Sequence, residues 1–191
     1  MDSSRTSLPL AVHSWAALIG CGQRFLIDVD ETGFMVEDAF TVAADDRIVV
    51  TTHRGDQIDV FAGNTPQLLI FIPAAFTPTC TREVCELDEL ATHANRMGVQ
   101  VLVASCDAPA TLAHWFKTLR ISSSIVGLSD HWPHGRLASY FGAFDETYGI
   151  AKRQSWAIRT SGECRLVAQV ASGEQRELSD HLRGMRWASV A

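Results

Sequence analysis

Apolar runs and segments of helical spacing alternate along the chain from residue 40 onward. Residues 68–72 and 99–104 are almost entirely apolar, which is typical of strands buried on both faces at the centre of an α/β sheet. Residues 83–97 carry apolar side chains at helical spacing and predict an amphipathic helix that packs on this sheet. Shorter segments complete the predicted order, with strands at 47–51, 57–60, 124–128, 155–158 and 165–170 and helices at 110–119, 135–140 and 174–187. The order predicts an α/β fold with a central mixed β-sheet and helices on both faces.

The start of the chain does not follow this pattern. Residues 8–21 are apolar apart from two positions, and a single arginine precedes them. We interpret residues 1–32 as an N-terminal extension and residues 33–191 as the folded domain. The tetrad that ends at Cys21 also resembles a bacterial lipoprotein cleavage box, although the basic start of a signal peptide is missing. Translation from Met35, just before the domain, is a third interpretation.

Composition and charge exclude several classes of protein. Of the 191 residues, 47% are hydrophobic and 20% are charged, as in an average globular protein, so a disordered chain is excluded. The net charge of −6 leaves no basic excess to neutralise phosphates, which argues against a nucleic-acid or membrane partner. No run reaches the ~18 apolar residues that a membrane-spanning helix needs. Five cysteines are too few, and odd in number, for a disulfide scaffold, so we expect reduced thiols in the cytoplasm.

One cysteine occupies a position that favours reactivity. A loop punctuated by prolines follows the apolar run at 68–72, and Pro78 is suited to the first position of the next helix. Cys80 then falls in the first helical turn, where unpaired N–H groups and the helix dipole favour a thiolate. Because the thiolate is the nucleophile, Cys80 is a candidate reactive residue. For an isolated cysteine, the alternative is a small buried hydrophobe.

The segment around Cys80 resembles the active site of a known family. Pro73, Thr77 and Cys80 match the P-x-x-x-T-x-x-C signature of peroxiredoxins, at the expected junction of strand, loop and helix. Further blocks resemble the family in the expected order, at residues 102–107, 129–135, 140–142 and 149–156. The resemblance covers residues 34–187 and is greatest to the E-type and Q-type (bacterioferritin-comigratory) subfamilies. It implies a thioredoxin-like α/β fold.

The resemblance also implies a chemistry and a role for each matched residue. Peroxiredoxins reduce hydrogen peroxide and organic hydroperoxides through a peroxidatic thiolate that becomes a sulfenic acid. Cys80 matches the peroxidatic cysteine, and Arg153 matches the cation that stabilises the thiolate and the leaving oxygen. Thr77 matches a hydroxyl that receives a hydrogen bond from the peroxide and donates one toward the sulfur, while Pro73 would shape the loop and shield the thiolate from water. Spacing alone would make Arg153 a surface salt-bridge partner.

How the sulfenic acid is resolved stays open. Cys85 follows Cys80 by five residues, as in the Q-type pattern, where the second cysteine resolves the first. In a helix, such residues lie about 140° apart around the axis and ~7.5 Å apart along it. Because this exceeds the ~7 Å limit for a disulfide, the first turn would have to unwind. In the alternative, Cys85 packs beside Leu87 and Leu90, and an external thiol attacks Cys80.

We expect the remaining cysteines of the domain to be structural. Cys106 ends a predicted buried strand, and Cys164 lies at a hairpin turn. The chain contains no C-x-x-C pair, which disfavours both dithiol exchange and a zinc site.

Together with the position of Cys80, the resemblance implies an enzyme, a thiol-dependent peroxidase that needs no metal, flavin or haem. The resemblance implies an external thiol as the reductant, either thioredoxin, a glutaredoxin-like protein or a low-molecular-weight thiol, and it implies a homodimer. The alternative is a non-catalytic redox sensor or binding module on the same fold.

Overall fold

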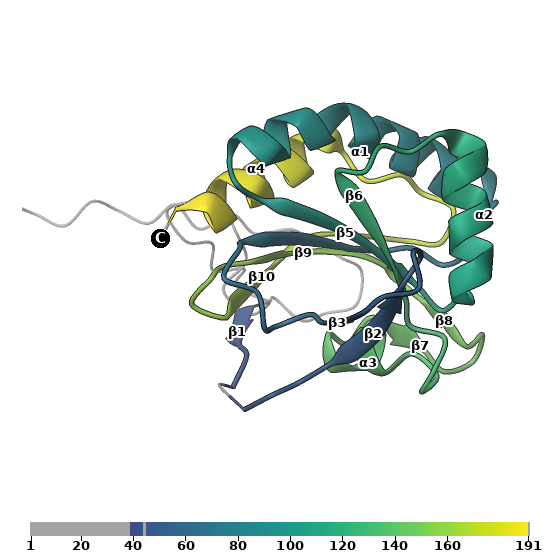
Figure 1. Cartoon of the computed structure of the whole chain (residues 1–191), viewed down its shortest axis with the longest axis horizontal. Coiled ribbons are helices and arrows are strands. Elements are labelled where there is room, and N and C mark those ends of the chain that lie inside the picture. The colour runs from purple at the N-terminus through teal and green to yellow at the C-terminus, as the bar shows by residue number, and fades with distance from the viewer. Residues whose placement is uncertain (1–38, 44, 191) are drawn as a thin grey trace, which may run out of the picture. The chain divides into compact units, whose positions relative to one another are not determined.

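A computed structural model describes residues 39–43 and 45–190 of the chain (Figure 1). The predicted extension at 1–32, and with it Cys21, lies outside the described residues, as does the alternative start at Met35. The described ranges contain every residue of the predicted catalytic site.

Eight strands of the described residues form one mixed sheet. In the order of the sheet they are β1 (Ala39–Thr41), β10 (Glu163–Val170), β9 (Arg153–Ile158), β4 (Gln67–Phe71), β5 (Gln100–Ser105), β6 (Ile125–Ser129), β2 (Val49–Thr52) and β3 (Gln57–Asp59). The central strands β4, β5 and β6 run parallel, whereas all other neighbours pair antiparallel. A separate hairpin consists of β7 (Phe144–Asp145) and β8 (Ile150–Ala151). The predicted mixed sheet is confirmed.

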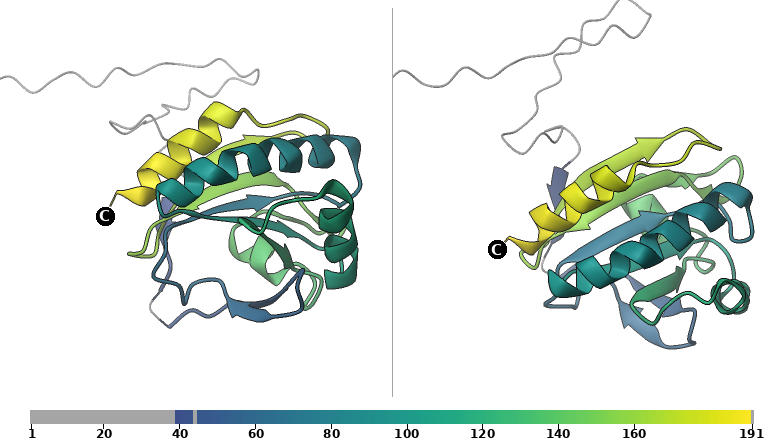
Figure 2. Two further views of the ribbon diagram at one scale, coloured as in Figure 1. Left: turned by 45° about the horizontal axis from the view of Figure 1, so that its top comes forward. Right: turned by 90° about the horizontal axis from the view of Figure 1, so that it is seen from above.

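Helices cover both faces of this sheet, as predicted. Within the described ranges they are α1 (Pro78–Arg96), α2 (Pro109–Leu119), α3 (Arg136–Tyr140) and α4 (Leu178–Ser189). The helices α1 and α4 lie side by side on one face, and α3 lies on the other (Figures 1 and 2). The helix α2 packs on β6. None of these helices combines the length and the hydropathy that crossing a bilayer requires.

One hydrophobic core fills the space between the sheet and α3. Leu69 and Phe71 of β4 point into it, because alternate residues of a strand face the same side. Phe141, which follows α3, packs its ring against Phe71 and against Trp156 of β9, with ring centroids 5.6 and 5.2 Å apart. Such tilted aromatic contacts join the middle of the sheet to α3.

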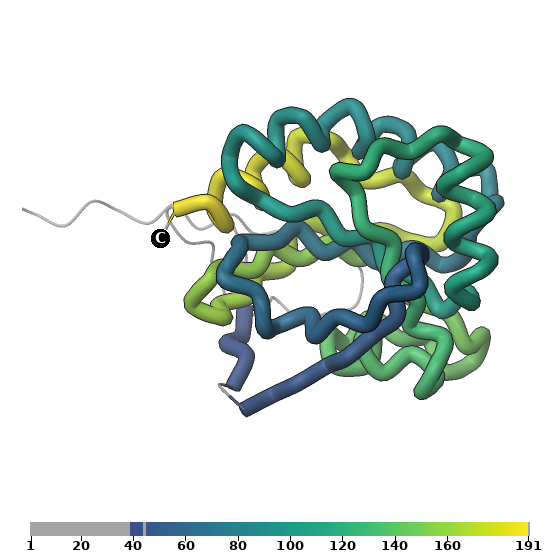
Figure 3. The backbone as a smooth tube through the Cα atoms, in the orientation of Figure 1, coloured from purple at the N-terminus to yellow at the C-terminus, as the bar shows by residue number. Residues whose placement is uncertain are grey.

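The close approach of α4 to the sheet depends on a glycine. A Cβ atom at Gly184 would lie 2.6 Å from Cγ2 of Val167 in β10, which is closer than packed carbon atoms come. The helix therefore lies directly on β10 and β4. The loop before α4 lies at the same end of the sheet as the start of α1 (Figure 3).

Several predicted boundaries differ from the structure, and two of these differences lie at the buried residues Arg153 and Arg176. The helix whose apolar spacing starts at residue 83 begins at Pro78, as that proline predicted, because its first turn carries no apolar pattern. The final helix, predicted from 174, begins at Leu178, because residues 171–177 form a loop that turns Arg176 inward. The strand β9 begins at Arg153 rather than at 155. Charge at these positions hid them from an analysis of apolar spacing.

Candidate active site

The site lies at the carboxyl end of β4, where the chain passes through a loop into α1. Thr77 is the N-cap residue of α1 and Pro78 occupies its first turn, so Cys80 falls in that turn as predicted. The Cys80 side chain is fully buried. Phe76 adopts a left-handed backbone with a φ of 62°, which is uncommon for a residue other than glycine.

Asp107 fixes the loop from the neighbouring strand. Its Oδ2 atom accepts a hydrogen bond from the backbone N–H of Ala75 at 2.7 Å and another from the Ser105 hydroxyl at 2.9 Å. Because β4 and β5 run parallel, the residues after each strand meet at the same edge of the sheet. Asp107 therefore supports the loop of the site. It belongs to the block of resemblance at residues 102–107, in which no role was predicted for it.

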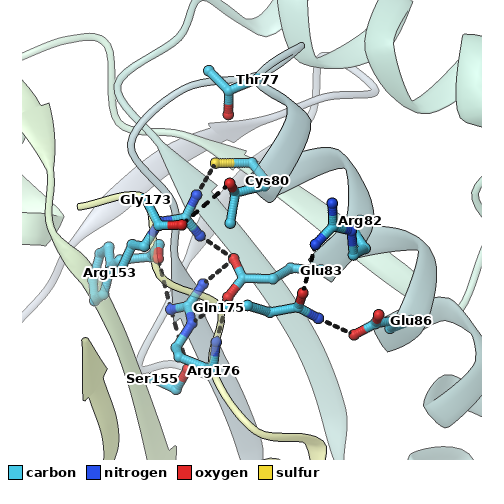
Figure 4. A network of polar contacts seen from close by, with 12 residues as sticks. Thr77, Cys80, Arg82, Glu83, Glu86, Arg153, Ser155, Gly173, Gln175 and Arg176 are labelled. Carbon is cyan, nitrogen blue, oxygen red and sulfur yellow. Dashed lines mark hydrogen bonds and ion pairs between the residues drawn. The ribbon is translucent and has the colours of Figure 1, made fainter. Parts of the chain in front are cut away.

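Arg153 reaches Cys80 from the start of β9. This strand pairs antiparallel with β4, so its first residue lies beside the end of β4. The Arg153 Nη2 atom lies 3.0 Å from the Cys80 Sγ atom and donates a hydrogen bond to it (Figure 4). Both side chains are buried, so little water screens the guanidinium charge from the sulfur. This arrangement places a fixed positive charge within hydrogen-bonding distance of the sulfur.

A buried carboxylate joins Arg153 to a second arginine. Glu83, one helical turn after Cys80, forms ion pairs with Arg153 and with Arg176, whose Nη2 atom lies 2.9 Å from Oε2 of the carboxylate. The Nε atom and the backbone N–H of Arg176 donate to the other carboxylate oxygen at 3.1 and 3.0 Å. Burial raises the pKa of Glu83, but the hydrogen bonds and charge of Arg176 and the charge of Arg153 outweigh it and hold that pKa below its usual value.

The charges of this buried group are unbalanced without the cysteine. Two guanidinium groups surround one carboxylate, which leaves one positive charge in a place shielded from water. A thiolate at Cys80 would bring the total to zero. Buried charges are tolerated when they are paired and hydrogen-bonded, so the arrangement is electrostatically suited to an anion at the sulfur.

The second arginine is anchored in the sheet. The Nη1 atom of Arg176 donates to the backbone carbonyls of Phe71 and Gln154, each at 2.8 Å, and to the Ser155 hydroxyl at 3.2 Å. The Ser155 hydroxyl also contacts Nε2 of the buried His181 at 2.9 Å. Burial and, next, the charge of Arg176 lower the pKa of His181 to about 3, so this ring is neutral. Arg176 thereby orients Glu83 and, through it, Arg153.

Thr77 and Pro73 belong to the loop between β4 and α1. The Thr77 hydroxyl is directed toward Cys80 (Figure 4) and donates its hydrogen bond to the Ala74 carbonyl at 3.1 Å. Its only proton is therefore used in the loop, which differs from the expected donation toward the sulfur and leaves its oxygen to accept. Pro73 and Arg153 line an open pocket of about 270 Å³ together with residues of β8 and β10.

The other cysteines lie in different surroundings. Cys85 is exposed on α1, so the alternative in which it packs beside Leu87 and Leu90 is wrong. Partial burial and three nearby carboxylates raise its pKa. Burial, followed by neighbouring acidic side chains, raises the pKa of Cys106 and of Cys164 to about 12. All four cysteines of the described residues are free thiols, and no cluster of three metal-ligating side chains occurs among those residues.

Two of the buried charges were missed from the sequence. Glu83 stands three residues after Cys80, a spacing that places both side chains on the same side of a helix, so this signal was available. Arg176 contacts Glu83 across 93 positions of sequence from a loop without apolar pattern, and no local signal pointed to it.

Comparison with known proteins identifies the family. The AhpC/TSA family matches residues 40–167. Alkyl hydroperoxide reductase E of Mycobacterium tuberculosis is 31% identical over 117 residues, which cover 61% of this chain and 75% of that protein.

Solved structures agree with this match in fold. The crystal structure of peroxidoxin BcpB from Mycobacterium tuberculosis superimposes with a TM-score of 0.63 at 24% identity, covering 78% of this chain and 93% of the other. The structure of AhpC from Enterococcus faecalis gives a TM-score of 0.65 at 23% identity and covers 74% of this chain and 87% of the other. Both likenesses confirm the predicted thioredoxin-like fold. The chain belongs to the AhpC/TSA family and is a peroxiredoxin, a thiol-dependent peroxidase.

Proposed function

We propose that Cys80 is the peroxidatic cysteine and that its thiolate attacks the distal oxygen of a hydroperoxide. A sulfur–oxygen bond forms as the oxygen–oxygen bond breaks, which leaves a sulfenic acid on Cys80 and an alkoxide or hydroxide that takes up a proton and departs as alcohol or water. The sulfur is oxidised and the peroxide is reduced. The observation that carries this proposal is the 3.0 Å contact between the buried Cys80 sulfur and the Arg153 guanidinium.

Three further residues complete the proposed site. Arg153 stabilises the thiolate and then the charge that moves onto the leaving oxygen, because the bond from its Nη1 atom to Glu83 holds the guanidinium in place beside the sulfur. The Thr77 oxygen accepts a hydrogen bond from the protonated peroxide oxygen, since its own proton is donated to the loop. Pro73 borders the pocket beside Arg153 and restricts water there.

We propose Cys85 as the resolving residue, with an external thiol as the alternative. In either case a thiol sulfur bonds to the Cys80 sulfur, and the sulfenic hydroxyl leaves as water. Since Cys80 is buried and Cys85 is exposed on the same helix, the first turns of α1 must open for this step. An external reductant, a thioredoxin, a glutaredoxin-like protein or a small thiol, then restores the thiols. A homodimer and a cytoplasmic location complete the proposal.

Replacement of single cysteines tests the assignment. We expect Cys80→Ser to consume no peroxide, whereas the matched Cys106→Ser and Cys164→Ser variants keep nearly all activity. The measurement is peroxide consumption with dithiothreitol as reductant, continued over many equivalents per protein. Activity in Cys80→Ser would refute the role of Cys80, and consumption of a single equivalent by the wild type would favour a redox sensor.

A further inference from the structure

The loop between β10 and α4 contacts the first turns of α1 through two layers of hydrogen bonds and ion pairs. The inner layer is the buried ion pair of Arg176 with Glu83. The outer layer lies nearer to solvent, where the Thr79 hydroxyl donates to the Gly173 carbonyl at 3.4 Å. These contacts follow one stripe of the helix, because residues three, four and seven positions apart lie on the same face.

Gln175 is the centre of the outer layer. Its side-chain carbonyl accepts a hydrogen bond from Nη1 of Arg82 at 3.4 Å, and its side-chain amide donates to the carboxylate of Glu86 (Figure 4). One side chain of the loop therefore connects two successive turns of the helix that carries Cys80. Neither Gln175 nor its two partners contacts the sulfur or Arg153.

The resolution step has to break these outer contacts. Cys80 is fully buried, so a sulfenic acid at this position must leave its pocket before any thiol can reach it. For Cys85 to be that thiol, the turn between the two cysteines must unwind, and Arg82 lies within it. Each contact that Gln175 makes with this turn opposes the opening, whereas the Arg153 contact that the proposed attack on peroxide uses is made with the helix closed.

We propose that Gln175 is a positioning residue that holds the first turns of α1 closed and so sets how fast the oxidised site opens to a thiol. The proposal rests on the proposed function of Cys80. Two fates compete for the sulfenic acid. A thiol converts it to a disulfide and water, whereas a second hydroperoxide converts it to a sulfinic acid and an alcohol. A tighter closure lengthens the life of the sulfenic acid and favours the second fate.

The test separates oxidation from resolution in Gln175→Ala. We expect the rate at which one equivalent of hydrogen peroxide oxidises Cys80 to stay at the wild-type value. The sulfenic acid should then disappear into a disulfide about two- to tenfold faster, the effect of losing ordinary hydrogen bonds from the closed state. The peroxide concentration that gives half sulfinic acid, read by intact-mass analysis, should rise by a similar factor.

Two further variants control this experiment. Glu177→Ala changes an exposed residue two positions along, whose side chain makes no capping hydrogen bond, and it should behave as the wild type. Glu86→Ala removes one of the two partners of Gln175 and should accelerate resolution as well. Because both changes remove one shared contact, the double variant should gain less than the product of the two single effects.

A second readout does not depend on peroxide chemistry. Alkylation of Cys80 by a maleimide in the reduced protein requires the helix to open, and peptide mapping separates it from alkylation of the exposed Cys85. We expect Gln175→Ala to accelerate alkylation of Cys80 about two- to tenfold. Wild-type resolution and alkylation rates in this variant, or an equal change in its peroxide step, would overturn the proposal. A wild-type protein that does not react with hydrogen peroxide would instead overturn the proposed function. The alkylation rate of Cys80 would still decide the role of Gln175.

Discussion

Cys80 and Cys164 are both fully buried, yet they lie at opposite ends of the β9–β10 ladder in different electrostatic surroundings. The Cys80 sulfur accepts a hydrogen bond from Arg153 at the first residue of β9. Cys164 pairs with Ile158 at the other end of β9, and its thiol donates to the Gly162 carbonyl at 3.5 Å. There, burial and the charge of Glu163 raise the thiol pKa to about 12. Cys164 is thus buried beside a carboxylate, whereas Cys80 is buried beside a fixed cation.

The two ends also differ in what surrounds the sulfur. Cys164 belongs to the apolar cluster between the sheet and α3, where an anion would lose its hydration without compensation. At the Cys80 end, Glu83, Arg153 and Arg176 form a buried group whose net positive charge a thiolate would balance. Substitutions that alter one part of this charged end at a time should therefore have effects of very different size.

Removal of the central anion should have the largest effect. Glu83→Gln leaves two buried guanidinium groups without a counter-charge, and we expect the free energy of unfolding at pH 7 to fall by about 3–5 kcal/mol. Chemical denaturation measures it. Glu89→Gln, the same change on the exposed face of α1, should cost far less. Equal losses in both variants would show that the buried group contributes nothing special to stability.

The stability from Glu83 also has a defined pH dependence. Its folded pKa lies below the unfolded value, so its contribution is fully present above the unfolded pKa and is lost as the pH falls through the folded pKa. The unfolded pKa of a glutamate is about 4.3, so this loss should occur only in strongly acidic solution. Glu83→Gln should remove that part of the profile.

Loss of the cation should make Cys80 resemble Cys164. We expect Arg153→Ala to slow the reaction with peroxide by about 10²–10³, the usual cost of removing one preorganised donor. Arg153→Lys should also be impaired, because a point charge cannot reach the sulfur and Glu83 as the planar guanidinium does. Stopped-flow measurement with one equivalent of peroxide gives the rate, and the exposed neighbour Lys152→Ala is the control. Wild-type rates in both Arg153 variants would remove it from the site.

The parts of this site differ in how far the sequence predicted them. Cys80, Thr77 and Pro73 lie within one short segment of the sequence, so one local motif contained them, and the apolar runs located the strand and helix around them. Arg153 depended on a separate block of resemblance. The sequence did not predict Arg176, because its contact with Glu83 depends on the tertiary course of a loop. A buried charged residue is also invisible to an analysis of apolar spacing.

His181 extends the charged end into α4 and should give it a second pH dependence. Burial and the charge of Arg176 lower the pKa of His181 to about 3. As the pH falls below about 6.5, the His181 ring is therefore protonated in the unfolded chain but stays neutral in the folded protein. Stability should therefore be complete above that pH and decline below it, by at most about 1.4 kcal/mol per pH unit.

Denaturation between pH 7 and 5 isolates this contribution, because Glu83 titrates at lower pH. We expect His181→Gln to flatten the profile in this interval, whereas His93→Gln, which changes an exposed histidine of α1, should leave it unchanged. An unchanged slope in His181→Gln would mean that another group controls acid stability.

The smallest structural change should accompany resolution at Cys85. If Cys85 resolves Cys80, one equivalent of peroxide should remove both thiols and leave the protein lighter by two hydrogen atoms. Cys85→Ser should stop at the sulfenic acid and over-oxidise more readily, because no neighbouring thiol traps the intermediate. Intact-mass analysis distinguishes these products.

Far-UV circular dichroism should show only a slight loss of helix on oxidation. Val84 and Leu87 are fully buried, so unwinding through Cys85 would cost up to about 1.5–3 kcal/mol for each of these side chains that became fully exposed. We therefore expect α1 to unwind between Pro78 and Val84 and to stay helical after Val84. The exposed Cys85 would then be near the new N-terminus of the helix. A wild type that accumulates sulfenic acid, together with normal turnover of Cys85→Ser on a small thiol, would show that an external thiol resolves Cys80. In that case the opening would need only to expose Cys80, and the buried Val84 would mark where it stops.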